Sequence, residues 1–248
     1  MKITTDRIDL LTPDGGHIRT FLAAPQAIGK YPGILFYSDI FQLTGPMLRS
    51  CARLAGYGFV VAAPEIYRRI ESPGLVIPFD DAGRTRGLQD AGNTPVADFD
   101  ADCRSVLDYL HRHPAVAAGQ IGAAGFCIGG HLAFRSSLQP DVRATVCFYG
   151  TGIHNGVLGK DPDAGSMQQA AKISGELLLV WGAQDPHMPE EGRQRIESAL
   201  KEAGANFSQR LYQTEHAFMR DEGSRYDSEA TDEAFSDMIR LYGRTFTR

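Results

Sequence analysis

The chain has 248 residues, of which 43% are hydrophobic and 22% are charged, and its formal net charge is −5. This amount of apolar surface excludes an intrinsically disordered protein. Lysine and arginine form no basic block, so we do not expect a nucleic-acid-binding protein. No apolar run approaches the roughly 18 residues that a membrane-spanning helix needs, so we expect no membrane span.

The first residues and the cysteines predict the compartment. The opening residues lack the apolar core of a secretory signal peptide. The chain contains four cysteines, which are too few for a scaffold held together by disulfides. We therefore expect a cytoplasmic protein whose thiols are reduced.

Apolar patterning predicts strands that alternate with helices. Two strand-like runs, 3–10 and 17–24, are separated by turn residues, which is typical of a β-hairpin. Continuous apolar runs typical of buried parallel strands then alternate with runs of helical spacing. The expected strands are 33–37, 59–63, 121–125, 144–149, 176–181 and 208–212, and the expected helices are about 46–55, 99–110, 128–138, 189–203 and 228–242.

This order of elements predicts the fold class α/β, with a mostly parallel twisted sheet, an N-terminal antiparallel hairpin and helices on both faces. We find no linker, and we expect a single domain over residues 1–248. Between about 64 and 97, glycines and prolines interrupt the pattern, although short helices could lie within this segment. Long irregular connections are usually functional or mobile, and we expect this one to lie over a site as a partial lid.

Reactive residues follow three of the predicted strands. In open α/β sheets, ligands bind beyond the carboxyl ends of the strands. Cys127, Asp185 and His216 each come shortly after an apolar run, in the order nucleophile, acid, base. We therefore expect these three side chains to meet at one edge of the sheet.

The sequence around Cys127 matches the nucleophile elbow, a tight turn between a strand and a helix with the pattern G-x-S-x-G. Here Gly125-x-Cys127-x-Gly129 carries cysteine in place of serine. Small flanking residues avoid clashes in this turn, and a helix N-terminus favours a thiolate. The backbone N–H of Ile128 would donate to an oxyanion. The alternative, a buried inert thiol, fits better for Cys51, Cys103 and Cys147.

Seven histidines compete for the role of the base. His216 lies past the last predicted strand, whereas His187 follows Asp185 by only two residues and the others lie upstream. The alternatives are a capping or surface role for His216 and a turn-forming role for Asp185. The shared placement of the three residues after strands favours the catalytic interpretation.

At these residues the sequence resembles the dienelactone hydrolase (carboxymethylenebutenolidase) family of α/β-hydrolases. The resemblance covers nearly the whole chain, and a cysteine elbow followed by two glycines is its most specific part. The motifs that carry it are Ser38-Asp39-Ile40-Phe41, Gly125-Phe126-Cys127-Ile128-Gly129-Gly130, Gly182-Ala183-Gln184-Asp185 with Pro189, and His216-Ala217-Phe218.

The resemblance implies a hydrolase that cleaves an ester or lactone through a Cys-Asp-His triad. Cys127 would form an acyl-thioester, His216 would carry the proton and Asp185 would orient His216. The backbone amides of Ile40 and Ile128 would hold the oxyanion. The resemblance implies no metal and no organic cofactor.

The resemblance also implies residues that activate the thiol and bind the substrate. Family members carry a glutamate that helps to activate the thiol, and Asp39, one methylene shorter, stands at its position. Two arginines hold the carboxylate of dienelactone in the family. Arg220 matches one of them, and Arg84 matches the other by spacing, with Arg86 as the fallback. The alternatives are a turn carboxylate for Asp39 and solvated surface charges for the arginines.

Two positions depart from the family pattern, and the segment 68–95 does not match the family residue by residue, which leaves substrate identity open more than reaction type. Gln42 stands where family members commonly have glycine, and Glu215 stands where they often have glycine before the histidine. A carboxylate close to His216 would raise its pKa if the two side chains approached each other.

Two other functions remain open at this stage. One is a broad carboxylesterase on the same triad, since the fold supports many chemistries. The other is a non-catalytic binding or redox-sensing protein that uses a reactive Cys127. We expect a small ester or lactone as the partner, anionic in the dienelactone case, with no nucleic acid and no membrane. A monomer or a small homo-oligomer is expected, and the sequence leaves the physiological substrate open.

Overall fold

The computed structural model describes residues 1–246 and contains one eight-stranded sheet with the order β1-β2-β4-β3-β5-β6-β7-β8. The first two strands form the predicted antiparallel hairpin, and β2 also pairs antiparallel with β4. From β4 to β8 all pairings are parallel. The strands are β1 Ile3–Leu11, β2 His17–Pro25, β3 Tyr31–Tyr37, β4 Val60–Pro64, β5 Val116–Phe126, β6 Val142–Phe148, β7 Glu176–Gly182 and β8 Asn206–Tyr212.

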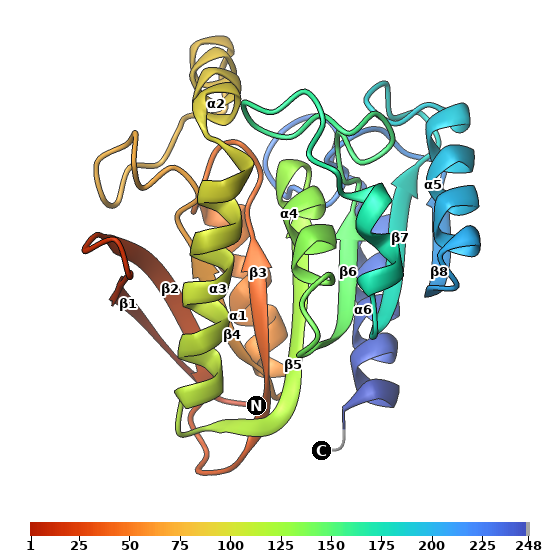
Figure 1. Cartoon of the computed structure of the whole chain (residues 1–248). Coiled ribbons are helices and arrows are strands. Elements are labelled where there is room, and N and C mark those ends of the chain that lie inside the picture. Colours follow the sequence, from red (N-terminus) through yellow and green to blue (C-terminus); the bar gives the residue numbers. More distant parts are fainter. Residues whose placement is uncertain (247–248) are drawn as a thin grey trace.

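Helices cover both faces of the sheet, as the sequence predicted (Figure 1). One hydrophobic cluster lies between the sheet and α3, α4 and α5, and a second lies between the sheet and α1 and α6. Each of α1, α3 and α6 buries one apolar face, as their spacing of apolar residues requires. The helices are α1 Gly45–Gly56, α2 Asp81–Asn93, α3 Val96–Arg112, α4 Ile128–Ser136, α5 Glu190–Glu202, α6 Ser228–Thr245 and a short 3₁₀ helix, η1 Met167–Lys172.

The segment from 64 to 97, expected to be irregular, contains the regular helix α2 and the start of α3. Asp80 begins α2, because its side chain accepts a hydrogen bond from the N–H of Gly83 at 2.7 Å. Glycines occupy several positions of this helix where apolar residues would otherwise mark a buried face. The apolar pattern therefore predicted no helix, although the N-cap is a recognisable signal.

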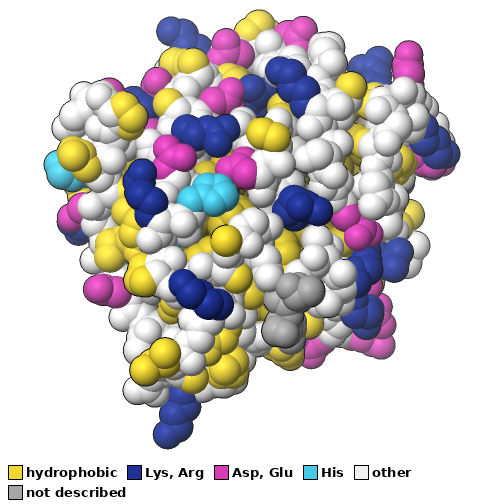
Figure 2. All heavy atoms as spheres, turned by 60° about the horizontal axis from the view of Figure 1, so that its bottom comes forward, with side chains coloured by type: hydrophobic (Ala, Val, Ile, Leu, Met, Phe, Trp, Pro, Cys, Tyr) yellow, Lys and Arg dark blue, Asp and Glu magenta, His cyan; other side chains and the backbone are white. Residues whose placement is uncertain are grey.

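The two ends of the sheet differ in character. The carboxyl ends of the parallel strands point towards α2 and the long loops at the top of Figure 1. The face at the bottom of that view carries positive and negative side chains interspersed with hydrophobic ones, and neither sign dominates it (Figure 2). Among residues 1–246, no helix combines the length and the apolar character that crossing a membrane requires.

Candidate active site

A cavity of about 790 Å³ opens at the carboxyl ends of the strands. Six stretches of the chain surround it: the turn after β3, helix α2 with the residues just before it, the elbow after β5, and the loops after β6, β7 and β8. All the residues that the sequence singled out for chemistry or substrate binding line it, except Asp185, which lies behind His216, and the fallback arginine Arg86. These lining residues are Asp39, Ile40, Arg84, Cys127, Ile128, His216 and Arg220.

The elbow that presents Cys127 has the strained backbone expected of a nucleophile. Cys127 has φ 58° and ψ −121°, a conformation that non-glycine residues rarely adopt. Its neighbours must lack a side chain: a Cβ on Gly125 would collide with the carbonyl of Gly129, and one on Gly129 would collide with the carbonyl of Ser38. The strain therefore persists because close backbone packing leaves the turn no alternative.

His216 and Asp185 form a buried hydrogen-bonded pair. The His216 Nδ1 lies 2.7 Å from the Asp185 Oδ2, and the two residues are 5% and 4% exposed. The second carboxylate oxygen accepts the backbone N–H of His187 at 2.8 Å. Both oxygens of Asp185 are thus engaged, which fixes the orientation of the imidazole ring.

The charge of Cys127 controls the protonation of His216. Burial alone lowers the pKa of His216, but the negative charge of Cys127 and the hydrogen bonds to Asp185 and Cys127 outweigh it and raise the pKa to about 10. Since Asp185 occupies Nδ1, the other ring nitrogen faces the thiol. This arrangement favours the protonated form of the His216 ring at neutral pH.

Two aromatic side chains that the sequence analysis did not assign to the site hold the His216 ring edge to face. Tyr149 lies with its ring centroid 5.2 Å from that of His216, and His187 lies 4.7 Å away. Tyr149 directly follows β6, but the predicted strand 144–149 included it, so the strand-end rule that located Cys127 did not select it. Burial, followed by the nearby charge of His216, lowers the pKa of His187 and favours its neutral form.

The two backbone amides expected to hold an oxyanion come from two different elements, helix α4 and the turn after β3. Ile128 is the first residue of α4, where N–H groups have no partner within the helix. Ile40 lies in the turn of residues 39–42, which Asp39 closes by accepting the N–H of Phe41 at 2.9 Å. Ile40 and Ile128 both line the cavity beside Cys127.

Asp39 and Arg220, 181 residues apart in the chain, form an ion pair in the cavity wall at 3.2 Å. Burial raises the pKa of Asp39, and the charge of Arg220 opposes that rise. The guanidinium carbon of Arg220 lies 4.9 Å from the ring centroid of Phe41 and 4.5 Å from that of Phe79. Two aromatic faces and one carboxylate therefore hold Arg220 at the cavity.

The structure distinguishes between the two arginines of α2. Arg86 is bound to Glu71 by two hydrogen bonds of 2.5 and 2.6 Å and does not line the cavity. Arg84 lines the cavity and forms no ion pair within residues 1–246. Of the two, Arg84 is the one placed to meet a ligand.

The two departures from the family pattern have different structural outcomes. Gln42 has φ 67°, the left-handed region in which glycine is unstrained, and this explains the glycine common in the family. Glu215 is exposed and lies 3.5 Å from Arg225, and it is not among the groups that shift the pKa of His216. The anion that does raise this pKa most strongly is Cys127.

The remaining thiols and a buried histidine belong to the core. Cys51, Cys103 and Cys147 are buried, and burial raises the pKa of each thiol. Both ring nitrogens of His131 are paired, with the Thr151 carbonyl at 3.1 Å and the hydroxyl of a serine at 2.8 Å. The described part of the chain contains no group of three or more side chains suited to a metal ion.

Comparison with known proteins identifies the family. The model of the dienelactone hydrolase family matches residues 18–246. The chain belongs to this family. A Saccharomyces cerevisiae protein provisionally named carboxymethylenebutenolidase is 34% identical to this dienelactone hydrolase family member, over 98% of this chain and 93% of the yeast protein. The carboxymethylenebutenolidase of Pseudomonas sp. strain P51 is 26% identical over 97% of this chain and 95% of its own length.

Solved structures agree in fold. A Klebsiella pneumoniae protein provisionally named a dienelactone hydrolase superposes with a TM-score of 0.86 at 24% identity, covering 98% of this chain and 100% of its own. This similarity confirms the predicted α/β-hydrolase fold. As a member of the dienelactone hydrolase family, the protein is a hydrolase enzyme, which sets aside the non-catalytic alternative.

Proposed function

We propose that this hydrolase cleaves an ester or lactone bond through Cys127, His216 and Asp185. The single observation that carries the proposal is the position of His216, hydrogen-bonded to buried Asp185 and in contact with Cys127 at the cavity. The strained elbow supports it, because strain of this kind collects at nucleophiles. The names of the relatives point to the same bond class.

In the first half of the proposed reaction, the Cys127 thiolate attacks the substrate carbonyl carbon and a carbon–sulfur bond forms. The carbonyl electron pair moves to oxygen, where the N–H groups of Ile40 and Ile128 stabilise the negative charge. The carbon–oxygen bond of the ester then breaks. The imidazolium of His216 gives its proton to the leaving oxygen, which in a lactone stays attached to the same molecule.

In the second half, water cleaves the acyl-thioester. Neutral His216 takes a proton from water, and the resulting hydroxide attacks the thioester carbonyl. The carbon–sulfur bond breaks, the acid leaves, and Cys127 and His216 return to the thiolate–imidazolium pair. Asp185 stays ionised and holds the ring in one orientation throughout.

Arg220 and Arg84 are the proposed contacts for a substrate carboxylate. The two cations line the same cavity as Cys127, so a small anionic lactone can reach both a cation and the nucleophile. Arg220 is paired with Asp39 before any substrate binds. A carboxylate that takes Arg220 would release Asp39, which we propose then assists Cys127 in the role of the family glutamate.

A broader carboxylesterase is the second candidate, and two exposed apolar side chains that line the cavity favour it. Leu88 of α2 and Val157 of the loop after β6 line the cavity while 51% and 46% exposed. Exposed apolar side chains at a cavity are suited to an uncharged acyl or alcohol group. The ion pair with Asp39 also leaves Arg220 with little net charge towards solvent.

The test is turnover of small anionic lactones and neutral aryl esters by the wild type and Cys127→Ala. We expect the variant to lose at least about 10³-fold in kcat/KM, because no other group can form the acyl intermediate. Cys147→Ala, which removes a core thiol outside the cavity, is the matched control and should retain activity. Wild-type rates in a folded Cys127→Ala would refute the mechanism, and the substrate panel decides between lactonase and carboxylesterase.

A further inference from the structure

The side chain of Gln42 joins the turn of residues 39–42 to the segment that follows β4. Its Nε2 donates to the carbonyl of Leu75 at 3.2 Å, and its Oε1 accepts the N–H of Tyr67 at 3.3 Å. Gln42 is 1% exposed, so water does not compete for these bonds. A buried amide thus links the turn to two points of the segment that follows β4.

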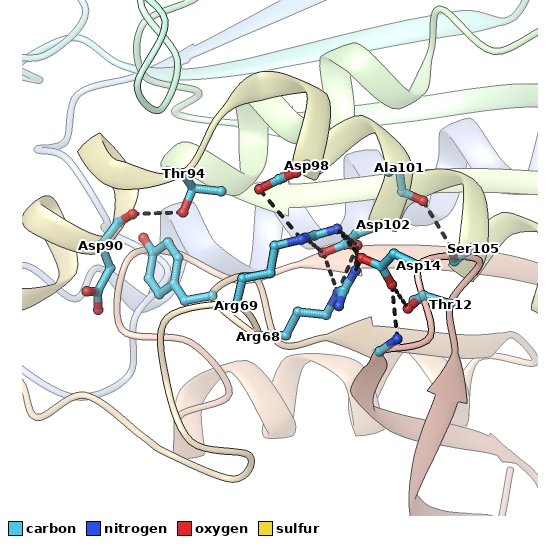
Figure 3. A network of polar contacts seen from close by, with 12 residues as sticks. Thr12, Asp14, Arg68, Arg69, Asp90, Thr94, Asp98, Ala101, Asp102 and Ser105 are labelled. Atoms are coloured by element: carbon cyan, nitrogen blue, oxygen red, sulfur yellow. Dashed lines mark hydrogen bonds and ion pairs between the residues drawn. The ribbon is translucent and has the colours of Figure 1, made fainter.

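That segment is itself firmly held. The two residues after Tyr67 both donate to the carboxylate of Asp102 in α3, Arg68 through Nε at 2.9 Å and Arg69 through Nη1 at 2.7 Å. Figure 3 shows both guanidinium groups converging on Asp102 and on Asp14 in the turn between β1 and β2. The partner of Gln42 is therefore fixed to the body of the domain.

Helix α2 packs on the same turn from the cavity side. A Cβ at Gly87 would lie only 2.6 Å from the carbonyl oxygen of Ile40, so the two backbones are in direct contact. The Tyr67 hydroxyl donates to the carbonyl of Gly87 at 3.2 Å, and the N–H of Ile77 donates to the carbonyl of Phe41 at 3.2 Å. The turn is enclosed between α2 and residues 67–77.

We propose that Gln42 is a positioning residue for the hydrolytic reaction, and that its clamped amide holds the Ile40 N–H in place for the oxyanion. This inference rests on the proposed function, because it needs Ile40 as an oxyanion donor. Gln42 adopts φ 67° at a conformational cost. The two buried hydrogen bonds of its side chain compensate for a strain that glycine would avoid.

The consequence is specific to one step. Losing an oxyanion donor costs about 10²–10³-fold in kcat, and a donor that is displaced rather than lost should cost less. The Cys127–His216 pair lies outside this clamp, and a neutral ester does not need Arg220, which is paired with Asp39 of the turn. With a neutral ester, a loosened turn should therefore lower kcat about tenfold and leave KM and the reactivity of the thiol unchanged.

Two variants test the inference. Gln42→Gly removes both side-chain hydrogen bonds of the clamp. It also removes the conformational strain at φ 67°, so this substitution adds no strain to the folded state. Gln42→Asn keeps an amide that tolerates positive φ but is one methylene too short to reach both partners. For both, assayed with a neutral aryl ester, we expect a kcat about tenfold lower with KM within twofold. The rate of Cys127 alkylation by iodoacetamide should match that of the wild type.

The outcomes separate this inference from the function on which it rests. Wild-type kcat in both variants would overturn it, as would a fall in alkylation rate that parallels the fall in kcat. Activity in Cys127→Ala would instead overturn the proposed function. Thermal unfolding of each variant, followed by circular dichroism, ensures that the kinetic values refer to folded protein.

Discussion

The two walls of the cavity are built in different ways. The chemistry wall, made of the proposed catalytic residues Cys127 and His216 with Asp185 behind them, follows directly from the ends of parallel strands. The recognition wall consists of the Asp39–Arg220 pair and of residues 65–93, a long excursion that follows β4 and ends in α2. Ladder hydrogen bonds and close glycine packing fix the first wall. Ion pairs and side-chain hydrogen bonds between distant residues fix the second.

The difference shows what each wall tolerates. The chemistry wall depends on backbone geometry, so substitution there should abolish the reaction. The recognition wall depends on pairs such as Arg220–Asp39 and Arg86–Glu71, and exchanging one partner should change which substrate is accepted or how stable the wall is. Substrate range can therefore vary on this fold while the reaction stays the same.

The substitution Asp185→Asn is the strongest test of this difference between the two walls. The amide cannot stabilise an imidazolium and favours the wrong tautomer of His216, so we expect kcat to fall about 10⁴-fold. Steady-state kinetics on the preferred ester measures the change. The control is Thr214→Val, a substitution at a buried position two residues before His216. Activity within tenfold of the wild type in Asp185→Asn would show that the buried pair is structural only.

The pH profile tests the same wall. The pKa of His216 is raised to about 10, so its charged form persists below that pH and is lost above it. We expect kcat/KM of the wild type to stay high through neutral pH and to fall only as the pH approaches 10. In Asp185→Asn the alkaline limb should move towards 6.5, because one source of the raised pKa is gone. If the alkaline limb of the wild-type profile lay near pH 6.5, this would contradict an ion pair between His216 and Cys127.

Arg220→Gln tests the recognition wall. A charged hydrogen bond to a carboxylate contributes about 1.5–3 kcal/mol, so KM for an anionic lactone should rise about 10- to 100-fold. KM for a neutral aryl ester should change less than twofold. Arg86→Gln removes a cation of α2 that does not line the cavity and serves as the control. An equal response of both substrate classes to Arg220→Gln would exclude a carboxylate contact.

The smallest effect concerns stability. Burial and then the Glu71 carboxylate raise the pKa of Asp90 in α2 to about 6. The folded state therefore binds a proton more tightly than the unfolded state, and stability is lost as the pH rises through 6. Asp90→Asn should gain about 1 kcal/mol of unfolding free energy at pH 8 and nothing at pH 4. Urea unfolding at the two pH values measures it, and equal changes at both would contradict the prediction.

The chemistry wall was predictable because its signals are local. An elbow motif, a strand end and the order of Cys127, Asp185 and His216 all depend on short stretches of chain. The fold followed for the same reason, since alternating apolar runs and helical periods each report one element. Even the strained position of Cys127 was predictable, because the flanking glycines mark it.

The recognition wall was less predictable because its order comes from long-range pairs. No feature of the sequence around Asp39 indicates that its side chain pairs with Arg220. Helix α2 was not predicted because glycine stands where the helix contacts the turn of residues 39–42. Glycine has no side chain, so such a contact adds nothing to the apolar periodicity of the sequence. His187 was judged only as a candidate base, although its backbone and its ring both support His216.

The glycines of the elbow limit how this protein can change. A Cβ at Gly125, Gly129 or Gly130 would meet backbone atoms: the Gly129 carbonyl, the Ser38 carbonyl and the Gly150 Cα. A clash with a side chain can be repaired by a smaller residue elsewhere, but backbone cannot be made smaller. No second substitution can therefore rescue a residue larger than glycine at these positions. The glycines around Cys127 therefore cannot be replaced, whereas exposed cavity residues such as Leu88 and Val157 are free to vary.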